Sequence, residues 1–195
     1  EKNVLVIVAS GNGNPDTKQA VDMDEEVFKK YYPCAYALPN IICVSSVDEE
    51  MKLYHNSNFG VAATHVSAPG EKIVSTLNTS KTAYGAMTGT SQATAFVSAL
   101  VALVYSQKPD LTALQVKAAI INSVDVYPHL QLTSLSSGVI NVEKTLSNLN
   151  NPEKLVLAEE LLREKLLAKK LLSKMREISK DKNALPEDVK NDIQN

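Results

Sequence analysis

The sequence predicts an α/β domain, layered around a mostly parallel sheet and followed by a helical tail. Segments with strand character alternate with helical segments up to about residue 150, an alternation typical of this class. The first of them, residues 4–9, is a continuous apolar run rich in β-branched residues, as in a parallel strand covered on both faces. After Asn150-Asn151-Pro152 the composition changes abruptly to Leu, Lys and Glu. We therefore expect two units, residues 1–150 and residues 151–195.

Size, charge and hydropathy narrow the classes of protein that this chain fits. With 195 residues, of which 44% are hydrophobic, the chain is long enough to bury a substantial core. A net charge of −2 and a pI near 6.0 give no electrostatic reason to expect a nucleic acid or an anionic membrane as partner. The longest apolar run, residues 93–105, is too short to span a bilayer. We predict a globular chain with no transmembrane segment and no nucleic-acid partner.

The first half of the chain reads as strands joined by polar segments. Residues 4–9 end at Ser10-Gly11-Asn12-Gly13-Asn14, and binding sites of parallel sheets form where strands end. Residues 15–32 are polar and acid-rich, which predicts a surface excursion. Further strand-like segments, the last leading through a hairpin-like passage, cover residues 41–47, 65–68 and 73–77.

Helices dominate the second half. Residues 92–107 are apolar nearly all round, which predicts a central buried helix. Thr112 and Gln115 have the spacing of a capping box, in which each side chain bonds the other residue's backbone N–H, and they open a second helix. Residues 138–149 predict a short strand and then a helix capped by Asn141.

The tail reads as one helix over residues 152–179. Pro152 after an asparagine is a good helix start, and acidic residues come early and basic residues late, in accord with the helix dipole. Leucine pairs at 161/162, 166/167 and 171/172 cover a wide arc, which disfavours a coiled coil and favours packing on another surface.

Ser91 is the best candidate nucleophile. It lies between a Gly-Thr turn and the predicted helix 92–107, where unpaired backbone N–H groups and the positive end of the helix dipole stabilise a developing oxyanion. The position suits acyl transfer. The alternative is a plain helix N-cap, a common place for serine.

Four sequence blocks carry a family resemblance. They are Val8-Ala9-Ser10-Gly11-Asn12, Tyr32-Pro33-Cys34-Ala35 with residues 40–44, Ser67-Ala68-Pro69-Gly70 with residues 73–76, and Gly89-Thr90-Ser91-Gln92-Ala93. In this order they resemble the C-terminal half of a subtilisin-like (subtilase) serine protease, over about residues 4–150. The resemblance implies the C-terminal half of the three-layer subtilisin-like fold, with its mostly parallel sheet.

The resemblance also implies roles for particular residues. Ser91 would attack the scissile carbonyl, while the Asn12 side-chain amide and the Ser91 backbone N–H would hold the resulting oxyanion. Ser10 and Gly11 would form a wall of the substrate pocket, and Pro33 would follow a cis peptide bond. Asn12 taken alone reads as a turn residue beside two glycines.

Two members of the family's catalytic triad are not assigned to this chain. In the family the aspartate and the histidine precede the asparagine block, and the chain starts only a few residues before that block. We expect them on an N-terminal portion of the same protease, and we expect this chain alone to be inactive, because a serine without a base is a poor nucleophile. His55, His65 and His129 read as surface or structural residues.

Two functions follow as hypotheses. The first is a serine endopeptidase acting on polypeptide through an acyl-enzyme, with Ser91 and Asn12 from this chain. The alternative is a catalytically dead subtilisin-like interaction module that docks a partner through its helical tail. Retention of both Asn12 and Ser91 favours the first, because a binding module has no use for the pair; an unrelated α/β binding domain fits the ordered blocks poorly.

No cofactor is assigned from the sequence, and structural calcium is the one alternative. The carboxylates of the excursion are calcium ligands by type, but they lack the glycine and closing glutamate of a calcium loop, so a solvated acidic loop is favoured; they are Asp16, Asp22, Asp24, Glu25 and Glu26. Cys34 and Cys43 are able to pair, which leaves the redox compartment open. The family resemblance favours a secreted or cell-envelope enzyme.

Overall fold

The computed structural model describes residues 3–14, 16–25, 31–36 and 38–151, together with positions 153, 155, 160, 162–164, 167, 168, 171 and 175. Its main sheet has five strands in the order β1-β2-β3-β7-β6, of which the first four are parallel and β6 is antiparallel. The strands are β1 Val6–Ala9, β2 Ile41–Val47, β3 Val66–Pro69, β6 Asp125–Val126 and β7 Gly138–Val139. The predicted α/β class and the mostly parallel sheet are confirmed.

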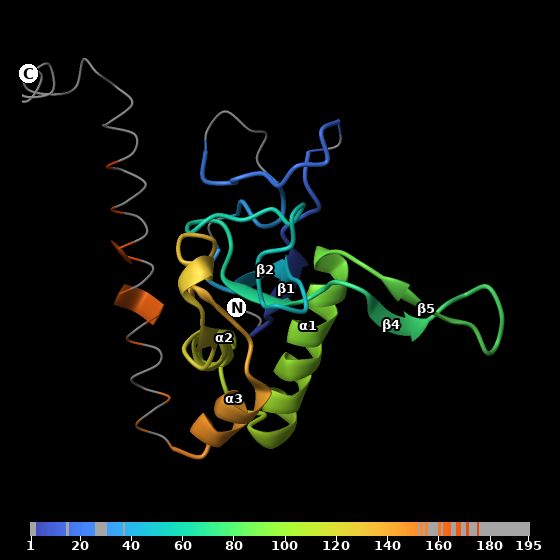
Figure 1. Cartoon of the computed structure of the whole chain (residues 1–195). Coiled ribbons are helices and arrows are strands. Elements are labelled where there is room, and N and C mark those ends of the chain that lie inside the picture. The colour runs from blue at the N-terminus through green and yellow to red at the C-terminus, as the bar shows by residue number, and fades with distance from the viewer. Residues whose placement is uncertain are drawn as a thin grey trace, which may run out of the picture.

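A separate hairpin projects from the body of the molecule. Its strands, β4 Ile73–Thr76 and β5 Tyr84–Met87, pair antiparallel and extend away from the main sheet (Figure 1). This confirms the hairpin-like passage expected before Ser91. The hairpin returns the chain to the start of helix α1, Thr90–Gln107.

Strand β2 is the centre of the sheet. All seven of its residues are buried, and its neighbours are β1 and β3. Strand β1 is the last strand on its side, so among the described residues nothing pairs with its outer edge. Val8 is buried, but Ile7 and Ala9 are only partly buried and Val6 is exposed, so the expectation of a strand covered on both faces is not met. The β-branched run marks a strand correctly but does not report its place in the sheet.

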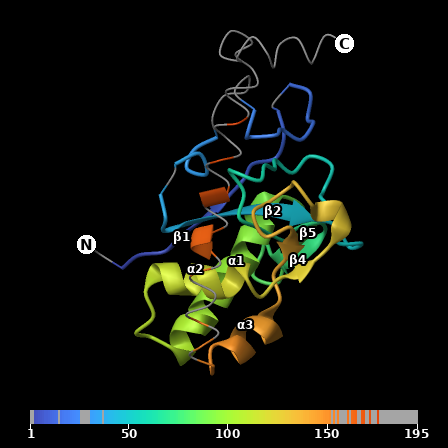
Figure 2. The same ribbon diagram turned by 90° about the vertical axis from the view of Figure 1, so that its left-hand side faces the viewer.

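Helix α1 packs one face on the sheet. Val97, Leu100 and Val104 share a core with residues of β2 and β3, to which α2 (Ala113–Ile121) and α3 (Val142–Asn148) also contribute. Figure 2 shows the three helices gathered below the sheet. On another face of α1, Phe96 is 42% and Leu103 45% exposed. The predicted all-round burial is therefore wrong for the described structure, because the sheet covers only one side. Within the described residues, no helix has the length and apolar character needed to cross a bilayer.

The helix caps follow the local sequence. Thr112 Oγ1 accepts the Gln115 N–H at 3.2 Å and Gln115 Oε1 accepts the Thr112 N–H at 2.9 Å, so the predicted capping box is confirmed. Asn141 Oδ1 accepts the Lys144 N–H at 2.8 Å and caps α3, as expected. A short 3₁₀ helix, η1 Pro128–Leu130, precedes β7.

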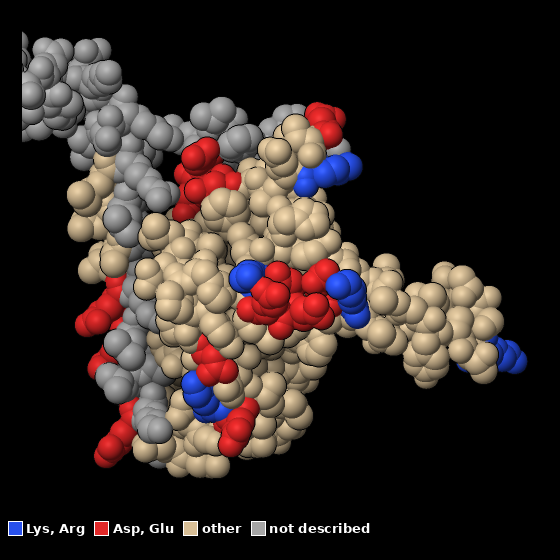
Figure 3. All heavy atoms as spheres, viewed as in Figure 1, with Lys and Arg blue, Asp and Glu red and all other residues tan. Residues whose placement is uncertain are grey.

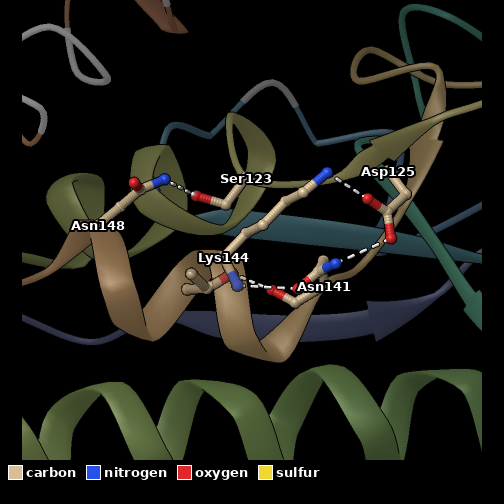
Figure 4. Close-up of polar contacts among 6 residues, drawn as sticks. Ser123, Asp125, Asn141, Lys144 and Asn148 are labelled. Carbon is tan, nitrogen blue, oxygen red and sulfur yellow. Dashed lines mark hydrogen bonds and ion pairs between the residues drawn. The ribbon is translucent and has the colours of Figure 1, made fainter.

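Polar contacts join α3 and its N-cap to Asp125 of β6 and to Ser123, which follows α2 (Figure 4). Asn141 Nδ2 donates to Asp125 Oδ2 at 2.9 Å, and Lys144 forms an ion pair with the same carboxylate. Asn148 Nδ2 donates to the Ser123 hydroxyl at 2.9 Å. The hydrogen bonds from Lys144 and then Asn141 lower the pKa of the Asp125 carboxyl below its usual value.

Cys34 and Cys43, which the sequence shows only as able to pair, form a disulfide. Cys43 lies in the middle of β2, so the bond anchors the segment around Cys34 to the most buried strand.

From residue 153 onward, the described residues of the tail have helical backbone. Leu162 is fully buried in a cluster with Ala118 and Ile121 of α2, and Leu155 packs against the main core. This contact agrees with the expectation that the tail packs on another surface, here helix α2. The division at residue 150 stays a prediction, and residues 176–195 lie outside the described part.

We expect Leu162→Ala to lower the free energy of unfolding by about 2–5 kcal/mol, because it removes a fully buried side chain between the tail and α2. Urea unfolding followed by circular dichroism measures the loss. The control is Leu167→Ala in the same tail, where the side chain is 66% exposed and the expected change is within about 0.5 kcal/mol. Equal effects of the two substitutions would contradict the docking of Leu162.

We expect Asp125→Asn to weaken the protein near neutral pH, and the weakening to disappear as pH falls through the folded-state pKa of Asp125. Because the folded-state pKa of Asp125 is lowered, its ion pair contributes stability above the unfolded pKa of about 4, and that contribution is lost as pH falls through the folded pKa. Both partners are partly exposed, so the difference at pH 7 should be about 1 kcal/mol or less. Melting curves between pH 2 and pH 7 test this, with exposed Asp110→Asn as the control; a difference that persists unchanged at pH 2 would count against it.

Candidate active site

The candidate site lies where β1 ends and α1 begins. Asn12, in the turn after β1, presents its side chain to Thr90, the first residue of α1 and the neighbour of Ser91. Its Oδ1 accepts the Thr90 N–H at 2.9 Å and the Thr90 hydroxyl at 3.1 Å. The structure thus brings Asn12 to the residue next to Ser91, across 78 positions of sequence.

These bonds orient the Asn12 amide. A backbone N–H only donates, so the atom that faces Thr90 is the carbonyl oxygen, and the Nδ2 group is left as the donor for another partner. Gly89 leaves room for the Asn12 Nδ2 group, because a Cβ at position 89 would lie 3.0 Å from that nitrogen. The φ of Gly89 is +154°, a value that residues with a Cβ rarely adopt. The geometry presents an amide donor beside the start of a helix.

The Thr90 side chain bonds two residues of the turn after β1, Gly11 and Asn12. It is fully buried, and its hydroxyl accepts the Gly11 N–H at 3.2 Å while donating to Asn12 Oδ1. One side chain therefore joins the β1 turn to α1. In the sequence, Thr90 belongs to a family block but has no predicted role; a threonine directly before the candidate nucleophile was the available signal.

Ser91 occupies the first turn of α1 and is exposed. The N-cap of the helix is Gly89, with no side-chain cap bond, so the alternative in which Ser91 is a plain N-cap is wrong. Within the described part of the chain, no hydrogen bond holds its hydroxyl. An exposed hydroxyl at a helix N-terminus is open to a base and a substrate.

Ser10 and Gly11, the two residues predicted to form a wall of the substrate pocket, differ in their exposure. Ser10 is nearly fully buried, and its hydroxyl donates to the Asn58 carbonyl at 2.8 Å, whereas Gly11 is half-buried. The Tyr32-Pro33 peptide bond is cis, as expected. A role of Ser10 and Gly11 in substrate binding stays a prediction.

The three histidines differ in burial and in hydrogen-bond partners. His65 is buried, and its Nδ1 accepts the Cys43 N–H at 3.0 Å. His129 is exposed with Nε2 at 2.8 Å from the Met51 carbonyl oxygen, and His55 is exposed. These contacts agree with the structural or surface positions expected for them.

In the acidic excursion, the carboxylates of Asp22 and Asp24 accept hydrogen bonds from backbone N–H groups. Asp24 accepts the N–H groups of Ala62 at 2.7 Å and Ala63 at 2.9 Å, and Asp22 Oδ1 accepts the Asp24 N–H at 3.0 Å. Among the described residues, no three side chains of metal-ligating type converge. Calcium stays an untested alternative to the favoured solvated acidic loop, and Glu26 lies outside the described part. On the face in Figure 3, the described acidic and basic side chains lie interspersed.

Comparison with known proteins gives a consistent result. The family model described as the Subtilase family matches residues 1–155. Subtilisin-like protease 3 of Plasmodium falciparum is 33% identical over 150 residues, covering 73% of this chain and 19% of that protein. One subunit of the subtilase cytotoxin of Escherichia coli is 33% identical over 155 residues, covering 73% of this chain and 44% of the relative.

A solved structure shares the fold as well. A structure of the subtilase cytotoxin SubAB assembly superposes with a TM-score of 0.64 at 25% identity, covering 82% of this chain and 51% of the matched one. The chain therefore spans about half the length of that structure and less than half of the two relatives.

We expect Thr90→Val to lower the free energy of unfolding by about 1–3 kcal/mol, because it leaves the Gly11 N–H without its acceptor and removes one bond to Asn12. Thr90→Ser keeps the hydroxyl and is the matched control. Urea unfolding of both variants is the measurement. A valine variant as stable as the serine variant would show that the bridging hydroxyl contributes nothing.

Proposed function

Since the chain belongs to the subtilase family, we propose that it is the part of a serine endopeptidase that supplies the nucleophile, Ser91, and the side-chain donor of the oxyanion hole, Asn12. The observation that carries the proposal is the pair of hydrogen bonds from Thr90 to Asn12 Oδ1, which leave Nδ2 free to donate beside Ser91.

The proposed chemistry is acyl transfer. Ser91 Oγ attacks the scissile carbonyl carbon as its proton passes to a histidine base, and the carbonyl oxygen becomes an oxyanion. Asn12 Nδ2 and the Ser91 backbone N–H donate to that oxygen. The C–N bond then breaks, the amine leaves with the proton from the histidine, and water hydrolyses the acyl-enzyme by the same route. In a subtilisin, loss of one such donor costs about 2.7–4 kcal/mol of transition-state stabilisation.

The base and its aspartate partner are proposed to come from an N-terminal portion of the same protease. The matched relatives are longer than this chain, which covers 19% of one and 44% of the other, and this leaves room for such a portion. Strand β1 has an unpaired outer edge among the described residues, and apolar side chains are exposed on β1 and α1, namely Val6, Phe96 and Leu103. A segment that extended the sheet beyond β1 and covered α1 would bury them.

A fluorophosphonate probe tests the proposal. In the complete protease, Ser91 Oγ should displace fluoride from the probe and form a stable bond to phosphorus, and Ser91→Ala should abolish both labelling and peptide cleavage. This chain alone should label poorly, because no described side chain forms a hydrogen bond with the Ser91 hydroxyl that would activate it.

The matched control is Ser98→Ala, an exposed serine on the same helix whose hydroxyl donates to the Thr94 carbonyl. It should label as the unmodified protein does. A complete protein that labels at another residue, or at none, would reject the proposal and favour the catalytically dead interaction module.

A further inference from the structure

Asn58, in the segment between β2 and β3, is fully buried against the turn that carries Asn12. Its Oδ1 accepts the N–H groups of Gly13 at 3.0 Å and Val21 at 3.1 Å, and its Nδ2 donates to the Ser10 carbonyl at 3.0 Å. Its backbone N–H donates to the Gly11 carbonyl at 2.9 Å, and its carbonyl accepts the Ser10 hydroxyl at 2.8 Å. One residue thus holds the turn on both sides of Asn12.

The chemistry of this position requires a carboxamide. The side chain accepts two N–H groups at one end and donates to a carbonyl at the other, and an ionised aspartate or an aliphatic residue does not do both. The fit is also close. Gly11 has a φ of +99°, and a Cβ there would lie 2.7 Å from Asn58 Nδ2. The turn lies directly on the Asn58 amide, with no room for another side chain between them.

The turn determines where the Asn12 amide points. Asn58 bonds the residues on either side of Asn12, and Thr90 bonds the Asn12 side chain itself. Oxyanion stabilisation depends on donors that are already in place before reaction, and small displacements of such groups are costly. Loss of the Asn58 amide would leave the Gly13 N–H and the Ser10 carbonyl without a partner in a buried setting.

We propose that Asn58 is the positioning residue of the oxyanion hole: its side chain sets the Ser10–Gly13 turn so that Asn12 Nδ2 points at the carbonyl attacked by Ser91. The inference rests on the proposed function. Asn58 does not touch substrate, so it acts through Asn12.

A double-mutant cycle in the complete protease tests the inference. Asn58→Ala should lower kcat on a cleaved peptide substrate by about tenfold or more while KM changes less, and it should slow fluorophosphonate labelling in parallel. In the Asn12→Ala background the same substitution should lower kcat by only about twofold or less, because the donor that Asn58 positions is already absent.

Asn56→Ala is the matched control. It removes the same type of side chain two residues earlier, where Oδ1 is buried without a hydrogen-bond partner, and it should leave kcat unchanged. If Asn58→Ala does not fold, Asn58→Asp gives the same cycle in a milder form, because an ionised carboxylate keeps the size of the side chain but cannot donate to the Ser10 carbonyl.

The outcomes separate the two proposals. A complete protease that neither labels nor cleaves rejects the proposed function. An active protease in which Asn58→Ala, or Asn58→Asp in its place, keeps kcat, or lowers it by the same factor with and without Asn12, overturns the positioning role alone.

Discussion

The contact between Asn12 and Thr90 is the interaction on which the candidate site depends. The first N–H groups of a helix have no acceptor inside the helix, and Asn12 Oδ1 supplies one to Thr90 at 2.9 Å. The same bond joins the end of an edge strand to the helix that packs across the sheet. One contact therefore satisfies a buried helix end and leaves the Asn12 amide nitrogen as a donor next to Gly89, the N-cap of α1.

The site is built on rigid elements, although its residues lie in turns. Strand β2 is buried throughout, and β1 pairs with it up to Ala9, just before the Ser10–Gly13 turn. Hydrogen bonds of the Asn58 side chain with Gly13 and Ser10 hold the turn, and α1 packs its buried face into the core. Turns anchored in this way place functional groups accurately without burying them.

The exposed parts of the core elements are as informative as the buried ones. Helix α1 is apolar on most of its surface, yet Phe96 and Leu103 are nearly half exposed, and β1 ends the sheet with an exposed valine. Apolar surface of this kind on central elements usually marks an interface. Together with relatives of which this chain covers less than half, it agrees with a domain whose other part covers β1 and α1.

The sequence by itself determined the features whose signals are local. The strand Ile41–Val47, the Thr112–Gln115 box and the Asn141 cap follow from a run of apolar residues or from partners three positions apart. The four ordered blocks indicated the family. Tertiary structure decided what joins distant positions: Asn12 to Thr90 over 78 residues, and Asn58 to Gly13 over 45. No periodicity spans such separations, so the roles of Thr90 and Asn58 emerge only when the folded chain brings their partners within hydrogen-bond distance.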